Sequence, residues 1–167
     1  MSASTTPALP DRARAFRDAM ATFPSGVTIV TTSDPEGRWW GFTATSFCSV
    51  SMQPPLVLVC LAETAECHPV FQQAEQWIVH VIHPEHADLA LRFATRGADK
   101  FADAGFVADD EGLPRLPNAC VTLYCTRHAA HPGGDHTILL GEVRETVLGE
   151  HLPAVYFRRR FHPLSHV

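Results

Sequence analysis

Apolar and β-branched residues alternate with polar residues in several short segments of the chain, a pattern typical of half-buried β-strands. The clearest example is Val-Thr-Ile-Val-Thr-Thr at residues 27–32, which an Asp-Pro-Glu-Gly turn at 34–37 joins to a second segment. The pattern predicts strands over residues 27–32, 38–44, 56–61, 77–82, 119–127, 137–147 and 154–157.

Helical spacing of apolar residues occurs in fewer places. Residues 11–23 carry Phe16, Met20 and Phe23 on one face, and Asp11 is a candidate N-cap. Shorter helices are predicted over 69–74 and 84–94, followed by a long connection at 95–118 that is rich in Gly, Pro and Asp. The sequence predicts a mainly β fold with inserted helices, in a small and nearly closed barrel. A parallel βαβ sheet is the alternative.

Composition narrows the classes of protein. The chain has 167 residues, of which 46% are hydrophobic and 19% charged, and its net charge is −5. This size predicts one domain over residues 11–167, after a short disordered leader at 1–10 without signal-peptide character. The apolar runs are too short for a membrane span, and no basic cluster precedes residue 158, which argues against nucleic-acid binding.

The five cysteines show no metal-ligand spacing. We therefore expect reduced thiols in a cytoplasmic protein and no metal site. Gly-x-Gly-x-x-Gly and Gly-x₄-Gly-Lys-Ser/Thr motifs are missing, as is the Gly-x-Ser-x-Gly elbow of many hydrolases. No clear pair of carboxylates suggests glycoside chemistry.

Three segments are candidates for a binding site. Residues 43–51, Thr-Ala-Thr-Ser-Phe-Cys-Ser-Val-Ser, place five hydroxyls among small side chains, which suits phosphate oxygens or the edge of a heterocycle. Lys100, the only lysine in the chain, adjoins Phe101 and could meet an anion beside a planar ring. His136 follows a glycine-rich turn and could contact a ligand at the barrel mouth.

Each segment also has a purely structural interpretation. The hydroxyls could line a solvated strand edge, Lys100 and Phe101 could be an exposed loop lysine with an anchoring aromatic, and residues 133–136 could form an ordinary hairpin. His80 is interpreted from the residues alone as a half-buried strand position.

Taken in order, these segments resemble the flavin reductase-like family, whose fold is the FMN-binding split barrel with Greek-key-like connections. The resemblance runs from about Phe16 to Phe161. It is carried by Phe-Arg-x-x-Met at 16–20, Pro-Ser-Gly-Val-Thr-Ile-Val-Thr-Thr from 24, Gly-Phe-Thr-Ala-Thr-Ser-Phe-Cys-Ser-Val-Ser at 41–51, Pro-Pro-Leu-Val-Leu-Val from 54, Arg-Phe at 92, Asp-Lys-Phe at 99, Gly-Gly-Asp-His at 133, Gly-Glu-Val at 141 and Tyr-Phe at 156.

The resemblance implies an NAD(P)H:flavin oxidoreductase that uses FMN or FAD with NADH or NADPH. It further implies a homodimer that supplies reduced flavin to a partner monooxygenase. It implies that the 43–51 segment contacts the flavin and that the long loop with Lys100 and Phe101 closes over it. It also implies that His136 lies on the side of the site that receives the nicotinamide. The cofactor-binding residues implied are Thr43, Ala44, Thr45, Ser46, Phe47, Ser49, Ser51, His80, Lys100, Phe101 and His136. No side chain is expected to act as an acid or base, because the cofactors carry the hydride chemistry.

Two other activities stay open at the level of sequence, since a fold does not fix a function. One is a flavin- or haem-binding module without catalysis. The other is a flavoenzyme that oxidises its own organic substrate.

Overall fold

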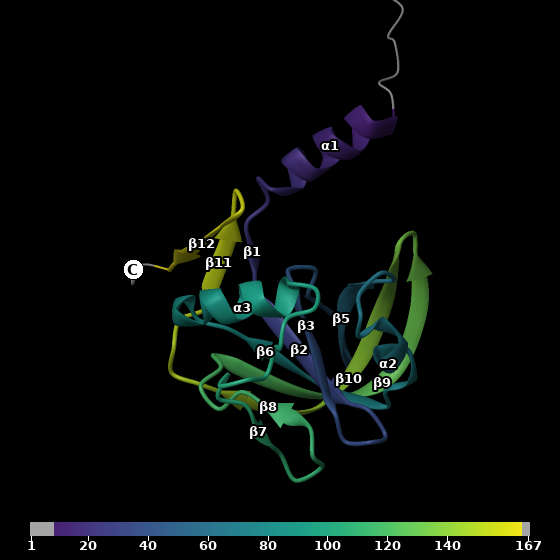
Figure 1. Ribbon diagram of the computed structural model, residues 1–167, viewed down its shortest axis with the longest axis vertical. Helices are drawn as coiled ribbons and strands as arrows, with labels where there is room; N and C mark the ends of the chain where they lie inside the picture. Colours follow the sequence, from purple (N-terminus) through teal and green to yellow (C-terminus); the bar gives the residue numbers. More distant parts are fainter. Residues whose placement is uncertain (1–8, 165–167) are drawn as a thin grey trace, which may run out of the picture.

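The computed structural model describes residues 9–164, and its centre is a seven-stranded antiparallel sheet that curls into a split barrel (Figure 1). The strand order is β3-β2-β6-β9-β10-β5-β4, so β6 and β9 are neighbours although two helices and a long segment separate them in sequence. The strands are β2 (Thr28–Ser33), β3 (Trp39–Ala44), β4 (Cys48–Met52), β5 (Pro55–Ala62), β6 (Gln76–Val81), β9 (Val121–Gly133) and β10 (His136–Leu148).

Two smaller sheets flank the barrel. One contains β1 (Ser25–Gly26), β11 (Ala154–Phe157) and β12 (Arg160–Pro163), and the other pairs β7 (Val107–Ala108) with β8 (Pro114–Arg115). The β7–β8 pair belongs to the long connection after α3, and it lies against β2 through a hydrogen bond from the Thr31 hydroxyl to the Pro114 carbonyl (2.6 Å). This connection therefore covers the outer face of the sheet.

The helices occupy distinct places. α1 (Leu9–Met20) projects away from the barrel, whereas α3 (Ala87–Ala94) lies across it (Figure 1). α2 (His68–Gln73) follows β5, and a single 3-10 turn, η1 (Pro84–His86), precedes α3. Among the described residues, no helix combines the length and the apolar character needed to cross a bilayer.

The core consists of two clusters on opposite faces of the sheet. The cluster inside the barrel includes Val30, Phe71 and Trp77, and the cluster beneath α3 includes Ile29 and Phe93. Five consecutive residues of β2, from Thr28 to Thr32, are buried. Since successive side chains of a strand point to opposite sides, both faces of β2 are covered. The buried hydroxyls of Thr28, Thr31 and Thr32 each donate to a backbone carbonyl, so this β-branched strand can be buried on both faces although half of its residues are threonines.

The predicted fold class, mainly β with inserted helices in a split barrel, is confirmed. The prediction missed β4 and the short strands β1, β7, β8 and β12, and it joined η1 and α3 into one helix. Leu9 and Pro10, assigned to the leader, already belong to α1, and the leader residues before them lie outside the described residues. The five cysteines are free, as expected. Cys67, Cys120 and Cys125 are buried, and Cys48 is exposed.

Candidate functional site

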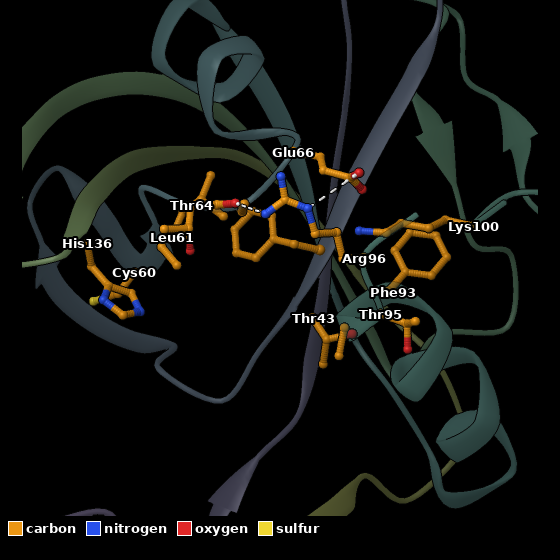
Figure 2. Close-up of a pocket in the computed structure, with 14 residues that line it drawn as sticks. Thr43, Cys60, Leu61, Thr64, Glu66, Phe93, Thr95, Arg96, Lys100 and His136 are labelled. Atoms are coloured by element: carbon orange, nitrogen blue, oxygen red, sulfur yellow. Dashed lines mark hydrogen bonds and ion pairs between the residues drawn. The ribbon is translucent and has the colours of Figure 1, made fainter. Parts of the chain in front are cut away.

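A pocket of about 340 Å³ opens between β3, β5 and the segment that follows α3 (Figure 2). Its apolar walls come from Phe42 and Leu61 of the barrel cluster and from Phe93 of the cluster beneath α3. Two cations, one carboxylate and one imidazole complete its charged lining, from Lys100, Arg96, Glu66 and His136. The pocket therefore lies where the two cores meet.

A glycine lets α3 come close to β3 at this place. A Cβ on Gly41 would lie 2.7 Å from Cε1 of Phe93, which is closer than carbon atoms approach without displacement. The Thr43 hydroxyl donates to the Ala90 carbonyl (2.6 Å), which ties α3 to the same strand. Both contacts hold Phe93 in position as a wall of the pocket.

Lys100 reaches the pocket from the loop that follows α3. Its ammonium donates to the carbonyl of Gly41 (3.0 Å), and the side chain is partly buried. One hydrogen bond leaves an ammonium with two further N–H donors. Lys100 can therefore contact an anion or a carbonyl oxygen of a ligand without leaving its position.

Arg96 and Glu66 connect the two loops that border the pocket. Arg96 Nη1 donates to the Thr64 carbonyl (3.3 Å), and Arg96 Nε lies 3.9 Å from Glu66 Oε1. The other carboxylate oxygen of Glu66 accepts from the Gly97 N–H (3.0 Å). Figure 2 shows the Arg96 side chain between these partners, with Lys100 and Phe93 on one side of the view and His136 on the other.

His136 begins β10, after the tight turn at Gly133–Asp135. Its Nδ1 lies 2.7 Å from Asp135 Oδ1, and 43% of its side chain is exposed. The hydrogen bond from His136 lowers the pKa of the Asp135 carboxyl, so this group is ionised at neutral pH and accepts the Nδ1 proton. Nε2 is thereby left as the ring nitrogen that can meet a ligand.

The 43–51 segment is only partly at the pocket. Thr43 lines it, and Ser46 borders it because its hydroxyl bonds to both the N–H (3.1 Å) and the carbonyl (3.3 Å) of the lining residue Cys60. The other residues of the segment do not line this pocket. Ala44 is buried, and Phe47 is partly buried against the barrel cluster. Thr45 lies on the connection to β4, and Ser49 and Ser51 lie on β4 itself.

Phe101 and His80 do not line the pocket. Phe101 packs edge-on against Trp39, Phe93 and Phe106, with ring centroids 5.0–5.5 Å apart, and so anchors the loop that carries Lys100. His80 is 0% exposed, not half-buried. Its Nδ1 bonds to the Ile29 carbonyl (3.0 Å), and its Nε2 accepts from the Leu116 N–H (3.1 Å). A flavin contact by His80 has no support in this arrangement.

Several lining residues escaped sequence reasoning. The end of β5 and the loop after it contribute Cys60, Ala62, Thr64, Ala65 and Glu66. The last residue of α3 and the two residues that follow it contribute Ala94, Thr95 and Arg96. The apolar strand at 56–61 and the Arg-Phe pair at 92 were recognised, but nothing in their pattern indicated that the residues just after each would face one another.

The pocket suits a flavin nucleotide. Its volume is within the range of small-molecule sites, roughly 300–1,000 Å³. Aromatic and aliphatic walls can pack against a flat heterocycle, and two cations with few protein partners can meet its phosphate. Among the described residues, no cluster of His, Cys, Asp and Glu could hold a metal ion.

Comparison with known proteins gives a consistent result. The Flavin reductase like domain matches residues 20–165. An actinorhodin polyketide dimerase from Streptomyces coelicolor is 51% identical over 87% of this chain and 83% of its own length. An NADH:riboflavin 5′-phosphate oxidoreductase from Streptomyces pristinaespiralis is 43% identical over 89% and 86%.

Solved structures agree with the sequence relatives. An NADH:FAD oxidoreductase from Streptomyces globisporus, solved in complex with NAD and FAD fragments, superposes with a TM-score of 0.87 at 32% identity. The match covers 96% of this chain and 98% of that protein. The resemblance inferred from the motifs is confirmed: the chain belongs to the flavin reductase-like family.

Proposed function

We propose that the protein is an NADH:flavin oxidoreductase that reduces FMN or FAD and passes the reduced flavin to a partner monooxygenase. The observation that carries the proposal is the pocket between Phe42, Phe93 and Lys100, in a chain of this family. Relatives named as the reductase components of 4-nitrophenol and 4-hydroxyphenylacetate monooxygenases, both 38% identical to this chain, support the partner class.

The protein's part in this chemistry is to bind and orient. A bound flavin would supply the redox chemistry, because its ring can take up a hydride from a nicotinamide. Phe42 and Phe93 present apolar surface to the ring, and Lys100 adds positive charge that favours the negative charge developed on reduction. His136 stands at the opposite side of the pocket, where it can contact the nicotinamide.

The direct test is to follow NADH and NADPH oxidation by the purified chain with added FMN, FAD or riboflavin. We expect flavin-dependent NADH consumption. A protein that takes up flavin but consumes neither nicotinamide would instead be a binding module, and the proposal would fail.

A second candidate follows from the 51% identity to a relative named as a polyketide dimerase. On this alternative, the chain acts with flavin on an organic substrate of its own, such as a polyketide. Tightly held flavin that turns over with such a substrate, and little reduced flavin released to solution, would favour this alternative over the reductase.

Replacing His136 with alanine should raise the KM for NADH severalfold and change flavin affinity less than twofold, because His136 lies at the side of the pocket proposed for the nicotinamide. Steady-state kinetics and a flavin titration measure the two quantities. Asp135→Asn, which keeps the imidazole but weakens its orientation by the carboxylate, should give a smaller rise in KM. Unchanged NADH kinetics in His136→Ala would refute the role.

We further propose a homodimer in a reducing, cytoplasmic setting, to which five free cysteines are suited. Support for the dimer comes from α1, which stands off the barrel (Figure 1). Residues 11–20 of this helix are all exposed. The side chains of Phe16 and Phe23 are 66% and 65% exposed, an arrangement that a second copy would cover. Light scattering should give twice the 18.3 kDa chain mass, and Phe16→Ser with Phe23→Ser should shift the mass towards the monomer. An unaltered mass in this double variant would count against α1 as the contact.

A further inference from the structure

Arg96 is the cation of the pocket that is bound most loosely to the protein. Its side chain is 75% exposed, and its ion pair with Glu66 is long at 3.9 Å. Lys100, by comparison, is partly buried and anchored to Gly41. An exposed ion pair of this kind contributes little to stability, so Arg96 can exchange its partner at small cost.

The guanidinium also has donors to offer. Of its five N–H groups, the contacts with Thr64 and Glu66 involve Nη1 and Nε, and Nη2 makes no hydrogen bond or ion pair within residues 9–164. A planar guanidinium binds a phosphate through two parallel N–H donors, which a point-like ammonium cannot do. Arg96 is therefore better suited than Lys100 to a phosphate group.

Glu66 places a negative charge at the same point of the pocket. Its carboxylate is held by the Gly97 N–H (3.0 Å), so it stays beside Arg96 instead of turning away into solvent. A phosphate that approaches Arg96 meets this carboxylate, which both occupies the guanidinium and repels the incoming charge. The acidic residue thus opposes the binding that the arginine favours.

We propose that Arg96 binds the 5′-phosphate on the ribityl chain of the flavin nucleotide, and that Glu66 competes with this phosphate and so promotes release of the flavin. The inference rests on the proposed function and deepens it. A reductase that hands its flavin to another protein needs affinity sufficient for capture and weak enough for release. The Arg96–Glu66 pair sets that balance through the phosphate, independently of the ring.

Riboflavin provides the discriminating measurement, because it has the same ring as FMN and lacks the phosphate. We expect Arg96→Gln to raise the Kd for FMN roughly tenfold, as for loss of one charge-assisted bidentate contact. The Kd for riboflavin should change less than twofold, and Arg96→Lys should recover part of the FMN affinity. Quenching of flavin fluorescence measures both constants without any need for turnover.

Glu66→Gln should act in the opposite direction. Glutamine keeps a carbonyl oxygen for the Gly97 N–H but loses the charge, so the Kd for FMN should fall severalfold and FMN should dissociate more slowly in stopped-flow displacement. Riboflavin binding should be unaffected.

The matched controls are Arg144→Gln for Arg96→Gln and Glu142→Gln for Glu66→Gln. Arg144 and Glu142 form an ion pair of 3.1 Å outside this pocket, so each control changes the net charge as its counterpart does and should leave FMN affinity unchanged.

Two outcomes would overturn the inference. Arg96→Gln could weaken FMN and riboflavin equally, which would indicate a damaged loop instead of a lost phosphate contact. Glu66→Gln could leave FMN affinity as it is, which would remove the competition. A wild-type protein that binds neither flavin would contradict the proposed function itself, a result distinct from both of these.

Discussion

Replacing His80 with leucine is expected to lower the free energy of unfolding by about 3 kcal/mol, although the side-chain volume hardly changes. Both ring nitrogens bond to backbone in a fully buried place, Nδ1 to the Ile29 carbonyl and Nε2 to the Leu116 N–H. Leucine would leave a buried donor and a buried acceptor without this partner, at roughly 1–3 kcal/mol each. Urea unfolding of the two proteins at pH 7.5 measures the difference.

The same residue predicts a pH dependence. Burial lowers the pKa of His80 to about 4, while an imidazole in the unfolded chain titrates near its ordinary value of about 6.5. Between these values the unfolded state binds more protons than the folded state, so stability is complete above about pH 6.5 and falls as the pH drops towards 4. In His80→Leu this contribution to the slope should be missing. The slope that remains should reflect His86 and His83, whose pKa values burial also lowers.

A matched control is available in His131→Leu, which replaces an exposed histidine of β9. We expect this variant to stay within about 0.5 kcal/mol of the wild type and to keep the full pH slope. A His80→Leu protein as stable as the control, with an unaltered slope, would show that the two buried hydrogen bonds contribute nothing.

His80 also illustrates a limit of sequence reasoning. The short apolar run Trp-Ile-Val-His-Val-Ile correctly predicts a strand near residues 77–82, and the structure has β6 at Gln76–Val81. Such a run does not by itself reveal whether its one polar residue faces water or is covered. Here residues 106 and 116 of the long connection cover it, and the histidine becomes a core residue.

The missed strand β4 has a different cause. Cys48–Met52 pairs only with β5, has a register irregularity between Ser49 and Ser51, and is mostly exposed. A short edge strand of this kind has no buried face to impose a period of two on its sequence. Its hydroxyl-rich composition was therefore interpreted as a binding segment, and only Thr43, before the strand, lines the pocket.

The site itself could be predicted in part. Lys100 and His136 were expected at the site, and both line the pocket. Arg96 and Glu66 were not, because they lie 30 positions apart on two loops that meet only in the folded chain. Single residues beside recognisable motifs can be found from sequence, whereas pairs formed by tertiary contact need the fold.

Removing the ammonium of Lys100 should have the largest effect on flavin binding. In Lys100→Met we expect the Kd for flavin to rise about tenfold or more, for riboflavin as well as FMN, because Lys100 lies next to Phe93 and Gly41 where the ring is proposed to pack. The loss should be greater for reduced than for oxidised flavin, since reduction adds negative charge to the ring. Anaerobic titrations with both forms measure it.

Lys100→Arg keeps the positive charge but not the ammonium that bonds to Gly41, so it separates the effect of the charge from the effect of this hydrogen bond. If the charge dominates, the Kd of this variant for flavin should be within a few-fold of the wild-type value. If the hydrogen bond that anchors the loop dominates, the Kd should be close to that of Lys100→Met. Equal flavin affinity in all three proteins would remove Lys100 from the site. Because Arg96→Gln is expected to affect FMN alone, the ratio of FMN to riboflavin affinity distinguishes a cation that meets the ring from one that meets the phosphate.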